Sequence, residues 1–505
     1  MNLKKNDGFY DIYLKEPIVL QNSFRQRSIT DVTPVPEFSE VRELMPQPFW
    51  DGHDDSIRCW WKAWELAFLN LRPANLENKF ISPFIDSAFN DCLFMWDSAF
   101  ILQFAKYGLR VFDFQSTLNN FYCRQHDDGF ICREIKEWDG GDRFHRFDPA
   151  STGPNVLAFA EWEYFNFTKD KNRLLEVFPA LLGYHRWMRK YRTWPDRSYW
   201  TTGWACGMDN QPRTSSSDEW VFYHDHQTWI DANFQALLST QILIKIVNLL
   251  NAKTETIQDI IDEEKNLSDY VNSFLWDGFY KDRSSDGSLS SVKTIGAFWC
   301  LHIDNIPKDR ILSMVKTLRN PELFNRPHRV PSLAANSPYY KKNGGYWQGS
   351  VWPSTNYMII SGLKKCGYLE DAREIAINHY NAVLDVFNNT ETFWENYAPE
   401  DFSPGSRAKK DFVGWSGLGP ITFFLEYIIG LHRDVLTDTL NWVISLTERH
   451  GVKKYPFGKD GIVNLECNKR SSVLERPVVN VTSNIPITIN ISWPGGCEII
   501  HSNQE

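Results

Sequence analysis

The chain has 505 residues, of which 42% are hydrophobic and 23% charged, and its formal net charge is −9. This composition is typical of a globular protein, and an acidic chain without a Lys/Arg-rich block argues against a nucleic-acid partner. We find neither a signal peptide nor an apolar run long enough to span a membrane, so we expect no membrane partner.

Nine cysteines, an odd number without a Cys-x-x-Cys spacing, give neither a disulfide framework nor a zinc signature. We therefore expect a reducing compartment, the cytoplasm, and neither a metal nor another cofactor. Aromatic residues make up 15% of the chain and include 21 tryptophans. Flat rings suit the apolar faces of sugars, although most of these residues must fill the core.

Residues 1–52 are rich in proline and poor in helical periodicity, so we expect an extended arm. Twelve segments with helical spacing follow. They lie at 57–72, 96–108, 114–124, 154–168, 172–191, 228–250, 255–275, 292–302, 308–319, 352–366, 369–387 and 417–431. The long connections between them carry the unusual residues, as expected where loops on a helical scaffold bear a site.

Two β-branched runs, 478–482 and 485–493, predict strands near the C-terminus, the second with isoleucine at alternate positions. The expected fold class is therefore all-α, a double ring of helices with a small C-terminal β appendage. The expected domains are the arm at 1–52, a helical catalytic domain at 53–438 and a β-rich domain at 439–505.

Residues 201–213 form an irregular loop, because Gly203, Gly207 and Pro212 interrupt any regular run. Such a loop can present Asp209 beside an aromatic ring and a fixed cation, Arg213. The alternative is an ordinary surface loop with a satisfied aspartate.

Glu395 stands between aromatic residues in the segment Phe393-Trp394-Glu395-Asn396-Tyr397. Partial desolvation there would raise its pKa and suit it to proton transfer. The alternative is a glutamate that caps the next helix or pairs with Lys409 or Lys410.

Asp97 and Arg133 are two further candidates for ligand contacts. Asp97 either accepts hydrogen bonds from sugar hydroxyls or caps the helix that follows. Arg133 either holds a carboxylate by a bidentate contact or forms a surface ion pair with Glu134.

Three tryptophans could form walls of a sugar site. Trp347 and Trp352 follow the glycine pair 344–345, which lets the backbone approach a ligand closely. They could equally be core residues at a helix start, and Trp415 could equally be packing. The alternating His224 and His226 lack further ligands at a fitting spacing, so we expect no metal site.

Several short motifs, in this order, resemble glycoside hydrolase family 63 and, more distantly, trehalases. They are Met95-Trp96-Asp97-Ser98, 128–134, 207–213, 331–334, 346–353, Trp394-Glu395-Asn396-Tyr397 and Gly414-Trp415-Ser416. The resemblance implies an (α/α)6 toroid, and hydrolysis of a small α-linked glycoside with inversion at the anomeric carbon.

Position by position, the resemblance implies that Asp209 is the general acid and Glu395 the general base. It places Trp96, Asp97, Asn210, Arg213, Trp347, Trp352 and Trp415 around the sugar, with Arg133 as a further binding candidate. Gln348 stands where the family often has arginine, and we expect it to contact the sugar as well. An inverting pair leaves room for a water, with the carboxyls roughly 6.5–9.5 Å apart.

The acid must hold its proton, so we expect Arg213 to contact sugar or to fix the loop rather than to touch Asp209. The implied partner is a small carbohydrate, and the oligomeric state stays open. A sugar isomerase or epimerase is the alternative, with His126, His145, His224 and His328 as proton shuttles. A non-catalytic sugar-binding protein is a third.

Overall fold

Helices carry the larger part of the chain in the computed structural model, which describes residues 15–214, 221–434 and 436–502. The main helices are α3 (Asp54–Leu69), α4 (Met95–Ala105), α5 (Asn119–Cys123), α6 (Leu157–Thr168), α7 (Lys171–Tyr191), α9 (Ile230–Leu249), α10 (Gln258–Phe274), α11 (Lys308–Leu318), α12 (Pro353–Lys365) and α13 (Leu369–Thr390). Tighter or wider turns form η5 (Phe114–Leu118), η7 (Ile295–His302), η9 (Trp415–Leu418) and η10 (Gly419–Ile429). The twelve predicted helical segments are confirmed to within a few residues.

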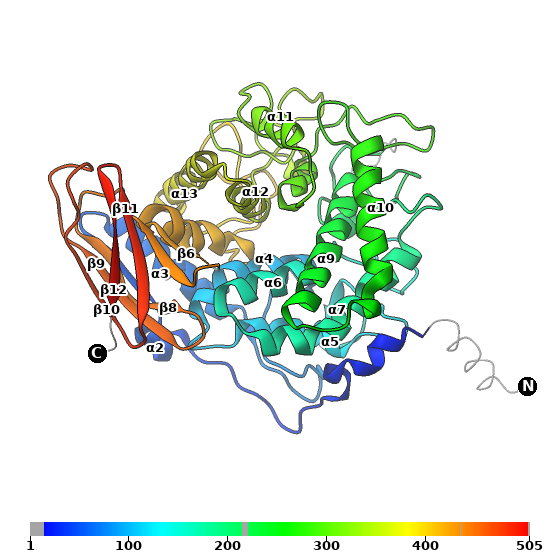
Figure 1. The fold of residues 1–505 in the computed structure, drawn as a ribbon, viewed down its shortest axis with the longest axis horizontal. Coiled ribbons are helices and arrows are strands. Elements are labelled where there is room, and N and C mark those ends of the chain that lie inside the picture. The colour runs from blue at the N-terminus through cyan, green and yellow to red at the C-terminus, as the bar shows by residue number, and fades with distance from the viewer. Residues whose placement is uncertain (1–14, 215–220, 435, 503–505) are drawn as a thin grey trace, which may run out of the picture.

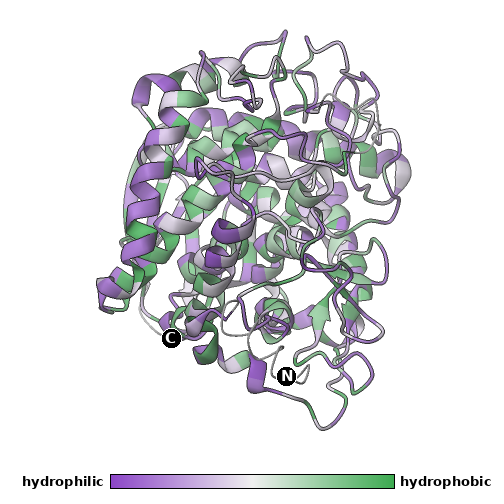
Figure 2. Cartoon of the chain, turned by 90° about the vertical axis from the view of Figure 1, so that its right-hand side faces the viewer, coloured by the Kyte–Doolittle hydropathy of each residue, from purple (hydrophilic) through white to green (hydrophobic). Residues whose placement is uncertain are grey.

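Six of these helices contact one another in closed order, α4 to α6, α9, η7, α12, η9 and back to α4. All eleven residues of α4 are buried, so it lies inside the helical body. Helix α10 instead buries a narrow stripe, Ile260, Leu267 and Val271, against α9. Figure 2 shows hydrophobic residues gathered between the helices and hydrophilic residues on their outer sides.

Two four-stranded sheets form a β layer at one side of the helices (Figure 1). One has the order β1 (Gln47–Trp50), β8 (His450–Phe457), β9 (Gly461–Cys467) and β10 (Val479–Ser483). The other has the order β12 (Gly496–Ser502), β11 (Ile487–Trp493), β7 (Thr439–Val443) and β6 (Leu431–Asp434), with β11 parallel to β7. Two short pairs, β2 (Leu71–Arg72) with β3 (Phe84–Ile85) and β4 (Cys92–Phe94) with β5 (Glu134–Lys136), lie among the helices.

The predicted all-α class is wrong, because strands hold 16% of the residues against 43% in helices. The two predicted C-terminal strands are confirmed as β10 and β11, and Ile487, Ile489 and Ile491 of β11 point into the core. Strands β7, β8, β9 and β12 lie within the region expected to be β-rich, although their bounds were not predicted. Strands β2 to β5 are too short for an alternating pattern, and Pro48 and Pro456 interrupt β1 and β8.

The sheets draw strands from both sides of the domain boundaries expected from the sequence. Strand β1 pairs antiparallel with β8 across some 400 residues, with Phe49 opposite Gly451. Strand β6 begins directly after η10 and joins the second sheet. The three domains stay a prediction. No helix in the part of the chain that the structure describes is long and apolar enough to cross a membrane.

Gly430 joins η10 to β6 at a point where only glycine fits. Its φ is +90°, and a Cβ there would lie 2.0 Å from the Val443 carbonyl oxygen. Gly367 has a similar φ of +84° but open space around it.

We expect Gly367→Ala to cost about 1–2 kcal/mol of unfolding free energy, the strain of a left-handed alanine. Gly430→Ala should cost about 2 kcal/mol more because the backbones must separate. Urea unfolding of both variants measures this, and equal losses would contradict it.

Candidate active site

A small pocket lies where several helices of the ring begin. Its volume is about 70 Å³, room for roughly five water molecules. The lining comes from the starts of α4 and η9, the turn before α6, the short helices α8 (Gly203–Cys206) and η8 (Tyr346–Gln348), and loops. The residues are Phe89, Phe94, Trp96, Asp97, Arg133, Gly153, Pro154, Trp204, Ala205, Gly207, Asp209, Tyr346, Trp347, Glu395 and Trp415.

The loop that carries Asp209 is shaped by a cap and a glycine. Thr202 accepts a hydrogen bond from the Ala205 N–H at 3.0 Å and starts α8. Gly207 ends α8 with φ +75°, and a Cβ there would stand 3.0 Å from the Trp96 indole. The backbone therefore passes directly over this ring, and Asp209 enters the pocket two residues later.

The surroundings of Asp209 favour its protonated form. Burial is the main cause that raises the pKa of Asp209, to about 7; the positive charge of Arg133 opposes it, and the charge of Glu395 adds to it. Asp209 is only partly buried by surface area, since its carboxyl opens into the pocket. Water can therefore reach the carboxyl, and protein atoms surround its other sides.

Glu395 lines the same pocket, and its surroundings favour the ionised form of the carboxyl more than those of Asp209 do. It is 1% exposed. The Tyr346 hydroxyl donates to Oε1 at 2.9 Å and the Lys409 N–H to Oε2 at 3.1 Å. Burial still raises the pKa of Glu395 to about 7, against these two donors and the Lys409 charge. The Lys409 ammonium itself donates to the Phe89 carbonyl at 2.7 Å, so it does not pair directly with Glu395.

Tryptophans support both the pocket wall and the segment of Glu395. The Trp415 Nε1–H donates to the Glu395 carbonyl at 2.8 Å. Trp347 faces the pocket and stacks on Trp352 with ring centroids 3.8 Å apart and planes 2° apart. Trp352 is fully buried behind it, so it supports the wall rather than lining it.

Asp97 and Arg133 both reach the pocket. Asp97 stands in the first turn of α4, whose N-cap is Phe94, so the capping alternative is wrong. Burial first, then the Glu395 charge, raises the pKa of Asp97 well above its usual range. Arg133 forms the ion pair with Glu134, Nη1 to Oε1 at 2.6 Å, and lines the pocket as well.

Four residues expected to contact sugar, Asn210, Gln348, Trp352 and Arg213, do not line the pocket. Asn210 joins two loops instead, because its Oδ1 accepts from the Trp347 N–H at 2.8 Å and its amide donates to the Gly345 carbonyl at 3.0 Å. The Gln348 amide donates to the Asn210 carbonyl at 3.2 Å. Both side chains therefore hold the Asp209 loop against the segment of Trp347.

Arg213 fixes the loop from behind, which is the second of the two roles expected for it, and it does not line the pocket. Its guanidinium donates to both carboxylate oxygens of Asp231 and of Asp282 at 2.7–2.8 Å. It is 3% exposed and lies over the Trp229 ring, 4.2 Å from its centroid. The guanidinium thus forms one bidentate contact with Asp282 through Nε and Nη2, and a second with Asp231 through Nη1 and Nη2.

Sequence analysis missed Tyr346, Phe94 and Phe89 as residues of the pocket. Tyr346 belongs to one of the quoted motifs, but the sequence gives no sign of its φ of +66°. That left-handed backbone, rare for a tyrosine, directs the hydroxyl to Glu395. Trp204 is the aromatic ring expected beside Asp209 in the same loop, and it lines the pocket.

None of the four histidines of the isomerase alternative lines the pocket. His126 pairs with Asp142 at 2.6 Å, His145 lies against Phe147, and His224 lies against Trp194. His328 is buried against His379. In the described ranges no group of three or more His, Cys, Asp or Glu side chains is placed to hold a metal ion.

Two carboxyl groups that face one small pocket, beside tryptophan rings, define the site of an enzyme that cleaves glycosidic bonds. Comparison with known families agrees. Residues 92–416 match the family described as "Mannosylglycerate hydrolase MGH1-like glycoside hydrolase domain". The chain belongs to this family of glycoside hydrolases. The isomerase alternative finds no support.

Named relatives are distant. The chain is similar to an uncharacterised protein of Borreliella burgdorferi, 26% identical, with 72% of this chain and 77% of that protein covered. A probable mannosyl-oligosaccharide glucosidase of Schizosaccharomyces pombe is 24% identical over half of this chain and 35% of its own length. The structure of a family 63 mannosylglycerate hydrolase from Thermus thermophilus, 19% identical, aligns with a TM-score of 0.57 over 72% of this chain and 99% of that one. That likeness concerns the fold.

Replacement of Arg213 by methionine tests how far this ion-pair network supports the site. The variant leaves Asp231 and Asp282 buried without a counter-charge, and we expect a loss of about 3–5 kcal/mol in unfolding free energy. The control is Arg319→Met, which breaks a similarly bidentate pair with Asp371 but on a side chain that is 55% exposed. It should cost about 1 kcal/mol or less. Urea unfolding compares the two, and equal losses would contradict the role of Arg213.

Proposed function

We propose that this protein is an inverting, exo-acting α-glycosidase in which Asp209 is the general acid and Glu395 the general base. One observation carries the proposal. Two carboxyl groups from loops 186 positions apart in the sequence meet in one pocket, and of the two Glu395 is the one that accepts from a side chain, the Tyr346 hydroxyl, within the described ranges. Hydrogen bonds to a carboxylate favour its charged form, so they mark Glu395 as the group that ionises first.

The chemistry follows from this division. Asp209 gives its proton to the glycosidic oxygen as the bond to the anomeric carbon breaks, and the aglycone leaves as an alcohol. Glu395 takes a proton from a water molecule whose oxygen bonds to the anomeric carbon from the opposite face. An α-linked substrate therefore yields a β-anomer. The next cycle requires the proton to return from Glu395 to Asp209 through solvent.

Coulomb repulsion keeps the two protonation states apart. Once Glu395 is ionised, its charge raises the pKa of Asp209, and the hydrogen bonds from Tyr346 and the Lys409 N–H favour Glu395 as the group that ionises first. The pair therefore holds one proton near neutral pH, on Asp209. Burial raises the pKa of Asp97 well above its usual range, which favours its protonated form, and a protonated Asp97 can donate to a sugar hydroxyl.

The size and walls of the pocket suggest the substrate class. The pocket is small, about 70 Å³, and well below the volume of sites that hold an extended ligand, which suits exo cleavage of a small glycoside. Trp96, Trp347 and Trp415 offer ring faces to this sugar, and Arg133 one positive charge. The glucosidase and mannosylglycerate hydrolase names of relatives make α-glucosides and α-mannosides, including glycosylglycerates, the first candidates. The cytoplasmic location stays a prediction.

The variants Asp209→Asn and Glu395→Gln test the pair. Each should lower kcat by about a thousandfold or more, since each removes a proton-transfer group, and should leave sugar binding within a few-fold. Turnover is measured on a panel of α-linked gluco- and manno-disaccharides and glycosylglycerates. Proton NMR of the wild type should detect the β-anomer first. Initial release of the α-anomer, or near-normal turnover in either variant, would refute the proposal.

The pH profile gives an independent test. Below about pH 7 Glu395 gains a proton and loses its action as a base, and above about pH 7 Asp209 loses the proton it must donate. We expect kcat/KM to follow a narrow bell centred near neutral pH. Tyr346→Phe removes a donor to the Glu395 carboxylate, so the acidic limb should move up by about one pH unit. Tyr340→Phe, which removes a donor to Glu400 outside the pocket, is the control. An unmoved acidic limb would contradict the role of Tyr346.

A further inference from the structure

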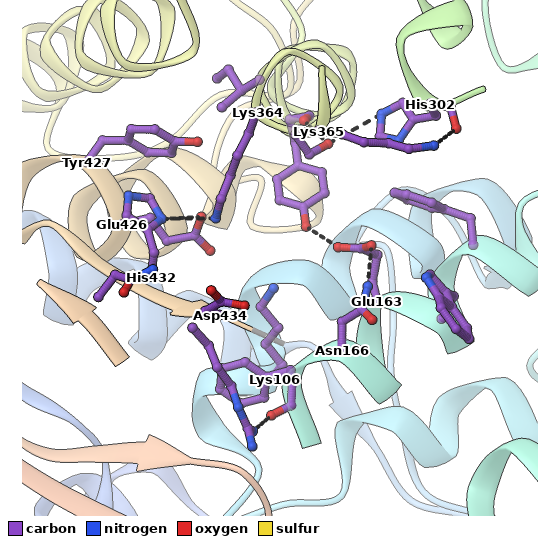
Figure 3. A pocket seen from close by; sticks show the side chains of 18 of the residues that line it. Lys106, Glu163, Asn166, His302, Lys364, Lys365, Glu426, Tyr427, His432 and Asp434 are labelled. Carbon is purple, nitrogen blue, oxygen red and sulfur yellow. Dashed lines mark hydrogen bonds and ion pairs between the residues drawn. The ribbon is translucent and has the colours of Figure 1, made fainter. Parts of the chain in front are cut away.

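A second and larger pocket lies at the opposite ends of the same helices. The turn after α4 and the middle and C-terminal parts of α6, α9, η7, α12 and η10 line it, and β6 and β8 close one side. Its volume is about 600 Å³, within the range of small-molecule sites. It shares no lining residue with the pocket of Asp209 and Glu395. Figure 3 shows side chains from several elements pointing into it.

One buried cation in this second pocket has no hydrogen-bonding partner in the part of the chain that the structure describes. Lys106, directly after α4, is 9% exposed and forms neither a hydrogen bond nor an ion pair there. Its ammonium lies 5.4–5.9 Å from the ring centroids of Tyr107, Phe167 and Tyr357 and points into the pocket (Figure 3). The negative ends of the helix dipoles explain why a positive charge is stable here. They do not explain why the three N–H donors of the Lys106 ammonium form no hydrogen bond to the described residues.

Lys364 is a second cation that lines this pocket. Its ammonium is 3.2 Å from His432 Nδ1 and forms no ion pair within the described ranges. Both ammonium groups lie near Glu426, and together with His432, 3.7 Å away, they hold the pKa of that carboxyl at about 2 although burial opposes this. Two cations thus share one carboxylate and keep donors free for a ligand.

Hydrogen-bond acceptors face the same space. Glu163 Oε2 accepts from the Tyr357 hydroxyl at 3.3 Å, and Glu163 Oε1 from the Asn166 amide at 3.2 Å. Glu426 Oε1 accepts from the Tyr107 hydroxyl at 2.8 Å. Each carboxylate oxygen can accept more than one hydrogen bond, so both retain capacity for ligand hydroxyls.

The charges of this second pocket balance. Its five lysine and arginine side chains are matched by three lining carboxylates together with Asp304 and Asp438, which pair with Lys245, Lys365 and Arg433. The negative ends of the converging helix dipoles disfavour an anion. Trp162, half-buried, adds an indole face to the lining. The ligand that fits is neutral, donates and accepts hydrogen bonds, and has an apolar face.

We infer that this pocket is a second carbohydrate site, which binds a neutral mono- or disaccharide away from the hydrolytic centre. Sugar hydroxyls can accept from Lys106 and Lys364 and donate to Glu163 and Glu426. The apolar face of the ring can rest on Trp162. The inference does not depend on the roles proposed for Asp209 and Glu395, because it concerns binding alone.

Ligand-detected NMR with glucose, mannose, maltose and trehalose at millimolar concentration tests this inference on the full chain. Matched tryptophan variants separate the pockets, since Trp96→Ala damages the hydrolytic pocket and Trp162→Ala the second one. In Trp96→Ala at least one sugar should still receive saturation from the protein. Addition of Trp162→Ala or Lys106→Met should weaken that binding about tenfold or more, because a ring face or a charged donor is lost.

Further arms of the experiment decide between ligand chemistries. Asn166→Ala, at a half-buried position, replaces Lys106→Met if the latter does not fold, as judged by circular dichroism. Inorganic phosphate and glucose 6-phosphate are the anionic probes. The inference is overturned if no sugar binds Trp96→Ala, if binding survives Trp162→Ala together with Asn166→Ala, or if the anionic probes bind and the neutral sugars do not. Turnover of Trp162→Ala should equal that of the wild type.

Discussion

The placement of Asp209 depends on a buried guanidinium. Arg213 lies four residues beyond the acid and is held by Asp231 at the start of α9 and by Asp282. The only helix in this loop is the single turn α8, which ends at Gly207, so the course of the chain beyond it must be fixed from outside. Arg213 fixes it from behind, and Asn210 fixes it from the side against the segment of Trp347. These contacts restrict the position of the Asp209 carboxyl group.

The same arrangement explains why a cation so close in sequence does not abolish the acid. A guanidinium in contact with Asp209 would lower its pKa and remove the proton at neutral pH. Arg213 donates its hydrogen bonds to two other carboxylates, Asp231 and Asp282, and their negative charges compensate its positive charge. Arg133, the cation that does face the pocket, is paired with Glu134 at 2.6 Å. Each positive charge near the acid is thus balanced, and burial decides the protonation of Asp209.

The sequence predicted the helices well because apolar periodicity records which side of a helix is buried. It predicted the two carboxyl groups through motifs in the right order, and the pocket brings both together. It could not tell which residues of a motif face the ligand. Trp347 and Trp352 look alike in sequence, yet one lines the pocket and the other stacks behind it. Tyr346 depends on a left-handed backbone, and β1 on a partner some 400 residues away, and neither leaves a local pattern.

Charged side chains differ between the two ends of the helix ring. Helix α4 begins with Trp96 and Asp97 in one pocket and ends beside Lys106 in the other, ten residues or about 15 Å further on. Helix N-termini carry partial positive charge and C-termini partial negative charge. Asp97 stands in the first turn of α4, where the dipole favours a negative charge, and Lys106, Lys364 and Lys365 stand at the ends of α4 and α12, where the dipole favours a positive charge. Because all eleven residues of α4 are buried, neither end can move without disturbing the core, so the shape of each pocket is tied to the packing of the same helix.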